Sequence, residues 1–367
     1  MDLLFSSSKQ FIKLCLATIF FGGAKKTFLP RVLRKTHYPI VVYYHRVCGR
    51  ENDLSSREII ISKETFEKQI EFLKNNFNIV PLEAIVDRMK SGAIRFSGDL
   101  VITFDDGYID NYTHAYPILK KHGVPATIFI TTDYIGTDRF FWWDRIHRLT
   151  REICKRKEGL IEINDHSIPE DFKPLLEQFC KGRSTFTPIT DYLKKKGKKV
   201  RDDIINRLEE RLGLVENQEK KVRQFLSWEE VKEMQNNGIT FGSHSHTHPV
   251  LTESSDDDVL KELTLSKKMI EEATGTIAWA FAYPDGWFDD RLKDLVMRAG
   301  YTCAFQTSRR PIHGKVDLFA IPRKMVKEGH SRGYGNRFSE AVFAAELSGL
   351  FDFIFVRELR KKNPYIE

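Results

Sequence analysis

The sequence predicts an α/β fold: a distorted (β/α)7-type barrel of about seven parallel strands, interrupted by a helical insertion. Short apolar, β-branched runs alternate with helical patterns, which is typical of βαβ units and a largely parallel sheet. This alternation stops over residues 138–226, a charged and mainly helical region, and then resumes. Polar residues with acid–base or metal-binding chemistry follow several predicted strands. Barrels of this kind place their active sites at those strand ends.

The composition indicates a folded protein without an evident nucleic-acid partner. The chain has 367 residues, of which 41% are hydrophobic, and can therefore bury a sizeable core. A net charge of +7 would suit nucleic acid, an anionic membrane or an acidic polymer. However, Lys and Arg are spread along the chain, and no nucleic-acid-binding motif occurs. We expect a solvated basic surface and no nucleic-acid partner.

The first 35 residues form a separate basic and apolar segment. Its apolar run, residues 14–24, is shorter than the about 20 residues that span a bilayer, and basic residues flank it on both sides. The favoured interpretation is a helix lying in a membrane interface. A helix packed on the domain and a cleaved signal peptide are the alternatives.

The first part of the barrel is expected over residues 36–137 and the second over residues 227–335. Predicted strands cover residues 39–47, 78–82, 100–104, 124–130, 239–242, 278–283 and 301–306. Predicted helices cover residues 62–77, 83–90, 111–122, 227–237, 256–273 and 289–299. The remaining residues, 336–367, are expected to contain a C-terminal helix over 338–359.

The five cysteines are widely scattered, and none forms a Cys-x-x-Cys pair. The sequence therefore predicts neither a disulfide framework nor a thiolate zinc site, and it favours a reducing compartment.

Two adjacent acids, Asp105 and Asp106, follow the buried strand at 100–104. Like charges at that distance either shift a pKa upward or hold a cation between them. A surface turn is the alternative, because Asp-Asp-Gly is ordinary turn chemistry.

Three alternating histidines follow the strand at 239–242, and Pro249 after them excludes a helix. His244 and His248 can converge on one cation while His246 points elsewhere. Two histidines and one carboxylate make a site for zinc or a similar divalent ion with an open position. One of the two aspartates would bind the metal, and the other would be free to act as a base.

Residues 103–108 (TFDDGY) and 244–249 (HSHTHP) resemble the first two signature motifs of the polysaccharide deacetylases, the NodB-homology group of carbohydrate esterases. The resemblance covers about residues 39–325 without the insertion. It implies that Asp105 is the catalytic base. It also implies that Asp106, His244 and His248 hold a divalent metal, with zinc the favoured ion, and that the partner is an N-acetylated glycan.

The third family motif, Arg-x-Pro with an aromatic residue, corresponds here to residues 282–286 (AYPDG), which lack the arginine that orients the base. We predict that Arg323, in residues 320–323 (AIPR) just after a predicted strand, takes its place. The resemblance puts Tyr283 and Asp285 beside the substrate. The backbone N–H of Asp285 is the expected oxyanion donor, a role that needs no particular side chain.

The last family motif, Leu-x-His, is missing from its usual place near the C-terminus. His45, at the end of the first strand, matches better, as in a circular permutation. This order resembles the branch that acts on exopolysaccharides such as poly-β-1,6-N-acetylglucosamine, in which His45 would be the general acid. A buried histidine bonded to a backbone carbonyl is the alternative.

Four aromatic residues are candidates for stacking on sugar rings: Tyr108, Trp142, Trp143 and Trp287. Packing in the core is the alternative, and we expect it for at least two of them.

The sequence thus predicts a metal-dependent hydrolase that removes N-acetyl groups from amino sugars of a polysaccharide or exopolysaccharide. One alternative is a deacylase of a lipid-linked sugar or of peptidoglycan, working at a membrane through residues 1–35. Another is a non-catalytic polysaccharide-binding protein, although such a module needs no free base. The substrate favours a membrane-associated or cell-envelope location, whereas the scattered cysteines would allow the cytoplasm.

Overall fold

The computed structural model describes residues 13, 15–17, 39–49, 56, 58–93, 96, 98–156, 168–214, 223–308 and 316–352. None of the described helices is both long enough and apolar enough to span a membrane.

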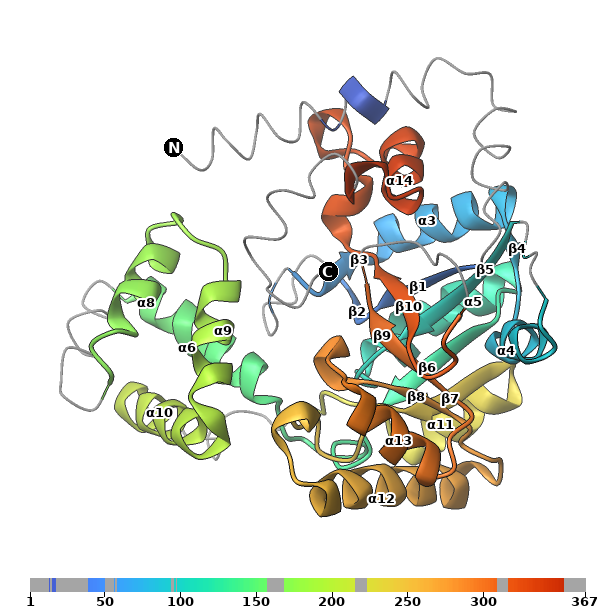
Figure 1. Cartoon of the computed structure of the whole chain (residues 1–367). Helices are drawn as coiled ribbons and strands as arrows, with labels where there is room; N and C mark the ends of the chain where they lie inside the picture. Colours follow the sequence, from blue (N-terminus) through green and yellow to red (C-terminus); the bar gives the residue numbers. More distant parts are fainter. Residues whose placement is uncertain are drawn as a thin grey trace.

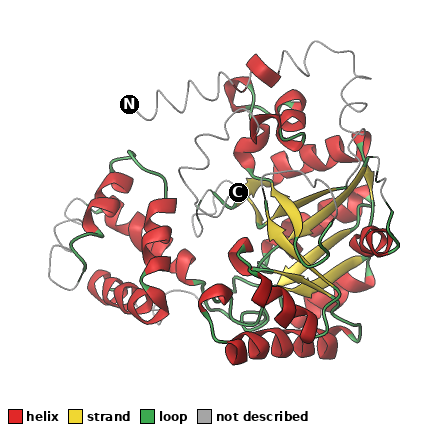
Figure 2. Cartoon of the chain, in the orientation of Figure 1, coloured by secondary structure: helices red, strands yellow, loops and turns green. Residues whose placement is uncertain are grey.

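Seven described strands, all parallel, close into a barrel, drawn in yellow in the right half of Figure 2. The ring runs β1 (Ile40–Tyr44), β5 (Asp99–Phe104), β6 (Ala126–Ile130), β7 (Ile239–Ser243), β8 (Ala280–Ala282), β9 (Cys303–Thr307) and β10 (Ile321–Met325). Pairing of β10 with β1 and of β1 with β5 closes it. A short further strand, β4 (Asn78–Ile79), lies beside the start of β5. The predicted fold class is confirmed.

Helices surround the strands (Figure 1). They are α3 (Lys63–Asn76), α4 (Leu82–Lys90), α5 (Tyr116–His122), α11 (Trp228–Asn236), α12 (Asp256–Thr274) and α13 (Asp290–Arg298). Their starts follow local sequence signals. The Ser62 hydroxyl accepts a hydrogen bond from the Thr65 N–H at the start of α3, and Ser227 forms a capping box with Glu230 at the start of α11. A π-helical turn (Asn111–Ala115) precedes α5.

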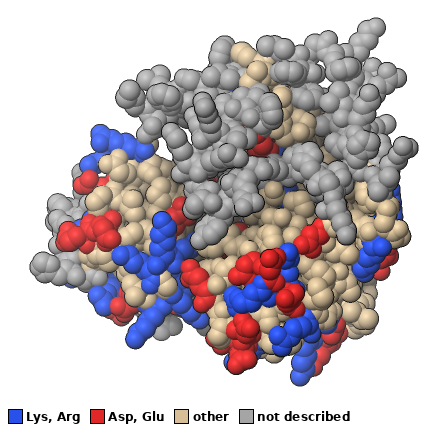
Figure 3. All heavy atoms as spheres, viewed as in Figure 1, with Lys and Arg blue, Asp and Glu red and all other residues tan. Residues whose placement is uncertain are grey.

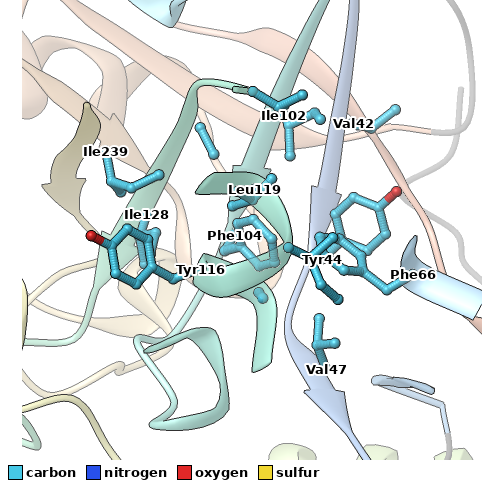
Figure 4. Close-up of a cluster of buried hydrophobic side chains, with 14 of the residues drawn as sticks. Val42, Tyr44, Val47, Phe66, Ile102, Phe104, Tyr116, Leu119, Ile128 and Ile239 are labelled. Carbon is cyan, nitrogen blue, oxygen red and sulfur yellow. The ribbon is translucent and has the colours of Figure 1, made fainter. Parts of the chain in front are cut away.

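The main core lies between the strands and the helices outside them. Figure 4 shows Val42, Ile102 and Ile128 from three neighbouring strands, packed with aromatic rings that include Phe66 of α3 and Phe104. The strand residues of β5 are buried throughout. Because the core is closely packed, the strands cannot shift relative to one another, and the residues at their ends are held in place.

The insertion is a helical unit with its own core. Its described helices are α6 (Trp142–Lys155), α8 (Lys173–Cys180), α9 (Thr187–Lys195) and α10 (Gly197–Leu212), drawn in green in Figure 1. Apolar side chains such as Leu149, Leu193 and Leu208 are buried among them. After the insertion, the chain returns beside the loop that follows β5. There the Leu226 N–H donates to the Gly107 carbonyl oxygen over 2.9 Å. The insertion is therefore anchored next to the predicted site.

The cysteine prediction was wrong. Cys154 in α6 and Cys180 in α8 form a disulfide, so the insertion is cross-linked. The two residues lie 26 positions apart on different helices, and sequence spacing alone gave no sign that they meet. A disulfide also argues against a reducing compartment, which removes the basis for that prediction.

The predicted strand at 39–47 is interrupted at His45. β1 ends at Tyr44, and β2 (Arg46–Cys48) pairs with β3 (Ile60–Ser62) in a separate two-stranded sheet. The chain leaves the barrel at this point because the Arg46 N–H donates to the Ile59 carbonyl oxygen. His45 thus lies at the junction of two sheets.

The described ends of the chain lie against each other. Lys13 forms an ion pair with Glu346 of α14 (Glu340–Leu347), and Ala17 is buried against the same helix. This is the packing that the alternative interpretation of the first segment predicts for these residues. Most of residues 1–35 and residues 353–367 fall outside the described part, so membrane contact stays a prediction.

Surface charge is mixed on the face drawn in Figure 3, where Lys and Arg side chains are interleaved with Asp and Glu. That face has the character of a solvated surface rather than a single-sign patch.

Loss of the disulfide should loosen the insertion. Closing a loop of this length stabilises a fold by about 3–4 kcal/mol in the chain-entropy model. We therefore expect the double variant Cys154→Ser/Cys180→Ser to unfold its insertion at lower denaturant concentration, as measured by limited proteolysis. A thiol reductant should produce the same shift in the wild type and none in the variant. Equal protease resistance of the variant and the oxidised wild type would contradict this prediction.

Candidate active site

A buried ion pair sits inside the barrel. The Arg323 guanidinium, from β10, donates to both carboxylate oxygens of Asp105, over 2.6 and 2.8 Å. It also donates to the Thr103 hydroxyl and lies against the rings of Tyr43 and Phe129. Burial would raise the pKa of Asp105, but the attraction of Arg323 outweighs it, and the pKa lies below its usual value. Asp105 is therefore an ionised carboxylate held in one orientation.

Asp106, the next residue, faces two histidines. The Nε2 atoms of His244 and His248 each lie 3.6 Å from the Asp106 Oδ1. Asp106 and His248 have left-handed backbones, with φ of 76° and 59°, which turn the two side chains toward each other. His246 points away, as predicted, and the structure places its Nδ1 2.9 Å from the Thr132 hydroxyl oxygen.

Hydrogen bonds orient the histidine loop. His244 Nδ1 lies 2.8 Å from the Ala282 carbonyl oxygen, so Nδ1 carries the proton and Nε2 has its lone pair free. The carboxylate of Glu262, in α12, accepts hydrogen bonds from the backbone N–H groups of His246 and Thr247, over 2.8 and 2.7 Å. The loop between the two candidate ligands is thus fixed from outside.

These three side chains fit a divalent metal. Donors on a tetrahedral zinc with bonds of about 2.0–2.1 Å lie roughly 3.4 Å apart, close to the observed 3.6 Å. Burial lowers the pKa of both histidines, that of His248 to about 3, so both rings are neutral and can donate a lone pair. Burial and the neighbouring Asp105 raise the pKa of Asp106 well above its usual value. A cation between these groups would offset that cost.

His45 lines the same cavity as this cluster. Its Nδ1 is buried and has no hydrogen-bond partner among the described residues, so this atom is not bonded to a backbone carbonyl there. Burial lowers its pKa to about 4, against the attraction of Asp105. The ring is therefore neutral at pH 7, and negative charge appearing beside it would raise its proton affinity.

The loop after β8 carries the predicted oxyanion donor. Asp285 has a φ of 57° and is followed by Gly286, where a Cβ would lie 2.0 Å from the Thr307 hydroxyl oxygen. The Tyr283 hydroxyl donates to the Phe319 carbonyl oxygen, which fastens the start of the loop. As the second residue of a short 3-10 turn, Asp285 has no acceptor for its N–H within the turn.

One cavity of about 230 Å³ joins these groups. The predicted site residues that line it are His45, Asp105, Asp106, His244, His248, Tyr283 and Asp285. Arg323 lies behind it, bonded to Asp105. The insertion forms another wall with Trp142, Trp143, Phe186, Thr190 and Lys194.

One aromatic prediction, for Tyr108, needs correction, and the contact of Trp287 with a substrate stays a prediction. The Tyr108 side chain is fully buried and does not line the cavity, so its ring is not free to stack on a sugar. Its hydroxyl instead donates to Asp144 and accepts from the Trp143 indole N–H, over 2.8 and 3.0 Å. Trp287 also lies outside the cavity lining, beneath the Lys194 ammonium. Trp142 and Trp143 do face the cavity.

Sequence reasoning missed the residues that distant segments bring to the site. These are Tyr43, Glu58, Lys194 and Thr307 in the cavity wall and Glu262 behind the histidine loop. Glu58 and Lys194 lie in segments without a recognisable motif. Only Tyr43, two residues before His45, had a usable signal, because alternate residues of a strand share a face.

Comparison with known proteins identifies the class. A family model described as polysaccharide deacetylase matches residues 97–177 and 180–304, more than half of the chain. The chain therefore belongs to the polysaccharide deacetylase family.

Relatives within this family are more distant. A Staphylococcus aureus (strain N315) protein named poly-beta-1,6-N-acetyl-D-glucosamine N-deacetylase is 34% identical over 152 residues, which are 38% of this chain and 51% of that protein. The Bacillus subtilis (strain 168) protein YxkH is 33% identical over 135 residues, 35% of this chain and 42% of that protein. The chain thus spans about half or less of the curated relatives it matches.

Solved structures share the fold. IcaB from Ammonifex degensii aligns with a TM-score of 0.54 and 17% identity, covering 85% of this chain and 97% of that one. The deacetylase PplD of Streptococcus pyogenes, in complex with acetate, gives a TM-score of 0.53 at 17% identity, with 84% and 97% covered.

Removing the Arg323 charge should damage both stability and pH response. In Arg323→Met, Asp105 becomes a buried carboxylate without a partner, which costs about 3–5 kcal/mol of unfolding free energy. Its pKa should rise, so the acidic limb of any pH–rate profile should move to higher pH. Denaturant titration and rate measurements from pH 4 to 8 test both effects.

The double variant Asp105→Asn/Arg323→Met is the matched control for stability, because it removes both charges. It should recover part of the lost free energy. A single variant as stable as the wild type would show that the ion pair does not hold the barrel interior.

Proposed function

We propose that this protein is a metal-dependent deacetylase that hydrolyses N-acetyl groups of amino sugars in a polysaccharide. One observation carries the proposal: an ionised carboxylate with its own arginine, Asp105, shares a cavity with a separate carboxylate–histidine cluster. An ion pair with only a structural role would not require a carboxylate–histidine cluster beside it. A non-catalytic polysaccharide-binding protein would require neither the ion pair nor the cluster. Family membership supports the reaction class.

The finer substrate class is proposed from similarity and cavity shape. The Staphylococcus aureus relatives are named for poly-beta-1,6-N-acetyl-D-glucosamine, and we propose an exopolysaccharide of this kind for the present chain. Trp142 and Trp143 line the cavity and offer apolar faces on which sugar rings can stack.

In the proposed mechanism, Asp106, His244 and His248 would hold a divalent ion, with zinc favoured. The bound ion supplies Lewis acidity and lowers the pKa of a water ligand toward neutrality. Asp105 accepts a proton from the attacking water, and Arg323 keeps that carboxylate ionised and aimed. The water oxygen bonds to the acyl carbon.

The remaining residues handle the charge and the leaving group. The Asp285 N–H donates to the carbonyl oxygen as negative charge builds on it. That charge raises the proton affinity of His45, which takes up a proton from solvent and delivers it to the amine nitrogen, while Asp105 later returns its own proton to solvent. The carbon–nitrogen bond then breaks to give acetate and a free amino sugar. His45 needs no proton before the reaction, which agrees with its lowered pKa.

Acetate release measured on a panel of substrates tests the proposal. We expect release from poly-β-1,6-N-acetylglucosamine oligomers, abolished by a chelator and restored by added zinc. Chitooligosaccharides, peptidoglycan and lipid-linked N-acetyl sugars are the other arms. Faster release from one of these would reassign the substrate, and no release from any arm would overturn the proposed activity.

Asp105→Asn should separate catalysis from metal binding. Loss of a general base lowers kcat by about 10²–10⁴-fold, whereas the metal content, measured by atomic absorption, should stay at the wild-type level. His248→Ala is the matched variant, expected to lose metal as well as activity. Wild-type turnover by Asp105→Asn would show that this residue is not the base.

A further inference from the structure

The insertion reaches the active-site loop through one charged contact. Lys194, in the last turn of α9, places its Nζ 2.5 Å from the Asp285 Oδ1. The two residues are 91 positions apart in the sequence, and both line the cavity. About one-fifth of each side chain is exposed, so solvent screens this pair only in part. The centre of the Trp287 ring lies 5.4 Å from the Lys194 ammonium, close enough for a cation–π interaction.

Asp285 occupies a backbone conformation that needs support. A residue other than glycine at a φ of 57° is strained, and such conformations persist only where the surroundings fix them. Gly286 follows at a φ of 74° and is packed against Thr307 with no room for a side chain. The Lys194 contact is the support that acts on the Asp285 side chain itself.

The same contact controls charge beside the reacting oxygen. Burial would raise the pKa of the Asp285 carboxyl, but Lys194 outweighs it and keeps the group ionised. The cavity already contains Asp105 and Asp106, so an unpaired Asp285 carboxylate would add a further negative charge. It would oppose the charge that develops on the acyl oxygen.

We propose that Lys194 is a positioning residue through which the insertion completes the active site. Its ammonium fixes Asp285 so that the backbone N–H is held for the oxyanion, and it cancels the carboxylate charge there. The inference rests on the proposed function. It assigns the insertion a part in the chemical step rather than in glycan binding alone.

Lys194→Met tests this role in the full chain, because it removes the charge and keeps the apolar stem. We expect kcat on a short N-acetylglucosamine oligomer to fall about tenfold, as expected for a misplaced group, with KM within twofold of the wild type. Lys195→Met is the matched control, since Lys195 is the next residue on the helix, is exposed and lies outside the cavity lining. It should keep wild-type kinetics. Lys194→Arg should restore most of the activity.

A double variant distinguishes action through Asp285 from action on the substrate. With Asp285→Asn, the unpaired charge is gone, so Lys194→Met/Asp285→Asn should be at least as active as Lys194→Met. Losses that multiply would overturn the inference. A raised KM with unchanged kcat in Lys194→Met would also overturn it, because Lys194 would then contact the glycan directly.

Hydrogen exchange measured by mass spectrometry gives a readout without turnover. Amides of residues 283–287 should exchange faster in Lys194→Met than in Lys195→Met, while the barrel strands are unchanged. Equal exchange in the two variants would overturn the positioning role even if activity falls. If the wild type releases no acetate from any substrate, the proposed function fails, and the exchange result still decides whether Lys194 positions the loop.

Discussion

The ion pair between Arg323 and Asp105 is the interaction on which the rest of the site depends. It joins β10 to the end of β5 across β1, and both partners are almost completely buried. Two charges inside a barrel are costly unless each is paired and hydrogen-bonded. Here two hydrogen bonds join the guanidinium to the carboxylate, and flanking aromatic rings stabilise the guanidinium charge. The barrel interior and the base are therefore stabilised by the same contact.

The pair also gives two adjacent aspartates different chemistry. Asp105 has a lowered pKa because Arg323 is attached to it, whereas Asp106 faces neutral imidazoles and has a raised pKa. Environments that give two neighbouring acids different pKa values are typical of acid–base sites. Asp106 has a left-handed backbone, and its Oδ1 lies 3.6 Å from the Nε2 atoms of His244 and His248. One peptide bond thus separates the carboxylate proposed as the proton acceptor from the carboxylate proposed as a metal ligand.

The sequence predicted those parts of the site that lie directly after strands. Asp105, Asp106, His244 and His248 were expected together because parallel strands of a barrel end on one side. Arg323 was expected because the third motif of the resembled family lacks, in this chain, the arginine that orients the base. The contact of Lys194 with Asp285 and the disulfide between Cys154 and Cys180 were not predicted. Both depend on how the helices of the insertion pack, which no local sequence pattern indicates. Tyr108 was misjudged for a similar reason: a ring next to a motif can face the core as readily as the substrate.

Apolar burial holds both walls of the cavity, but among the described residues only the insertion is also cross-linked. The barrel wall rests on apolar burial and ion pairing, while the wall that carries Trp143 and Lys194 belongs to a unit tied by Cys154 and Cys180. Thiol–disulfide equilibrium therefore acts on one wall alone. Reduction would leave the carboxylates and histidines in place but free the insertion to move against them. The redox state of the surroundings would therefore affect where Trp143 and Lys194 stand relative to the carboxylates and histidines of the barrel.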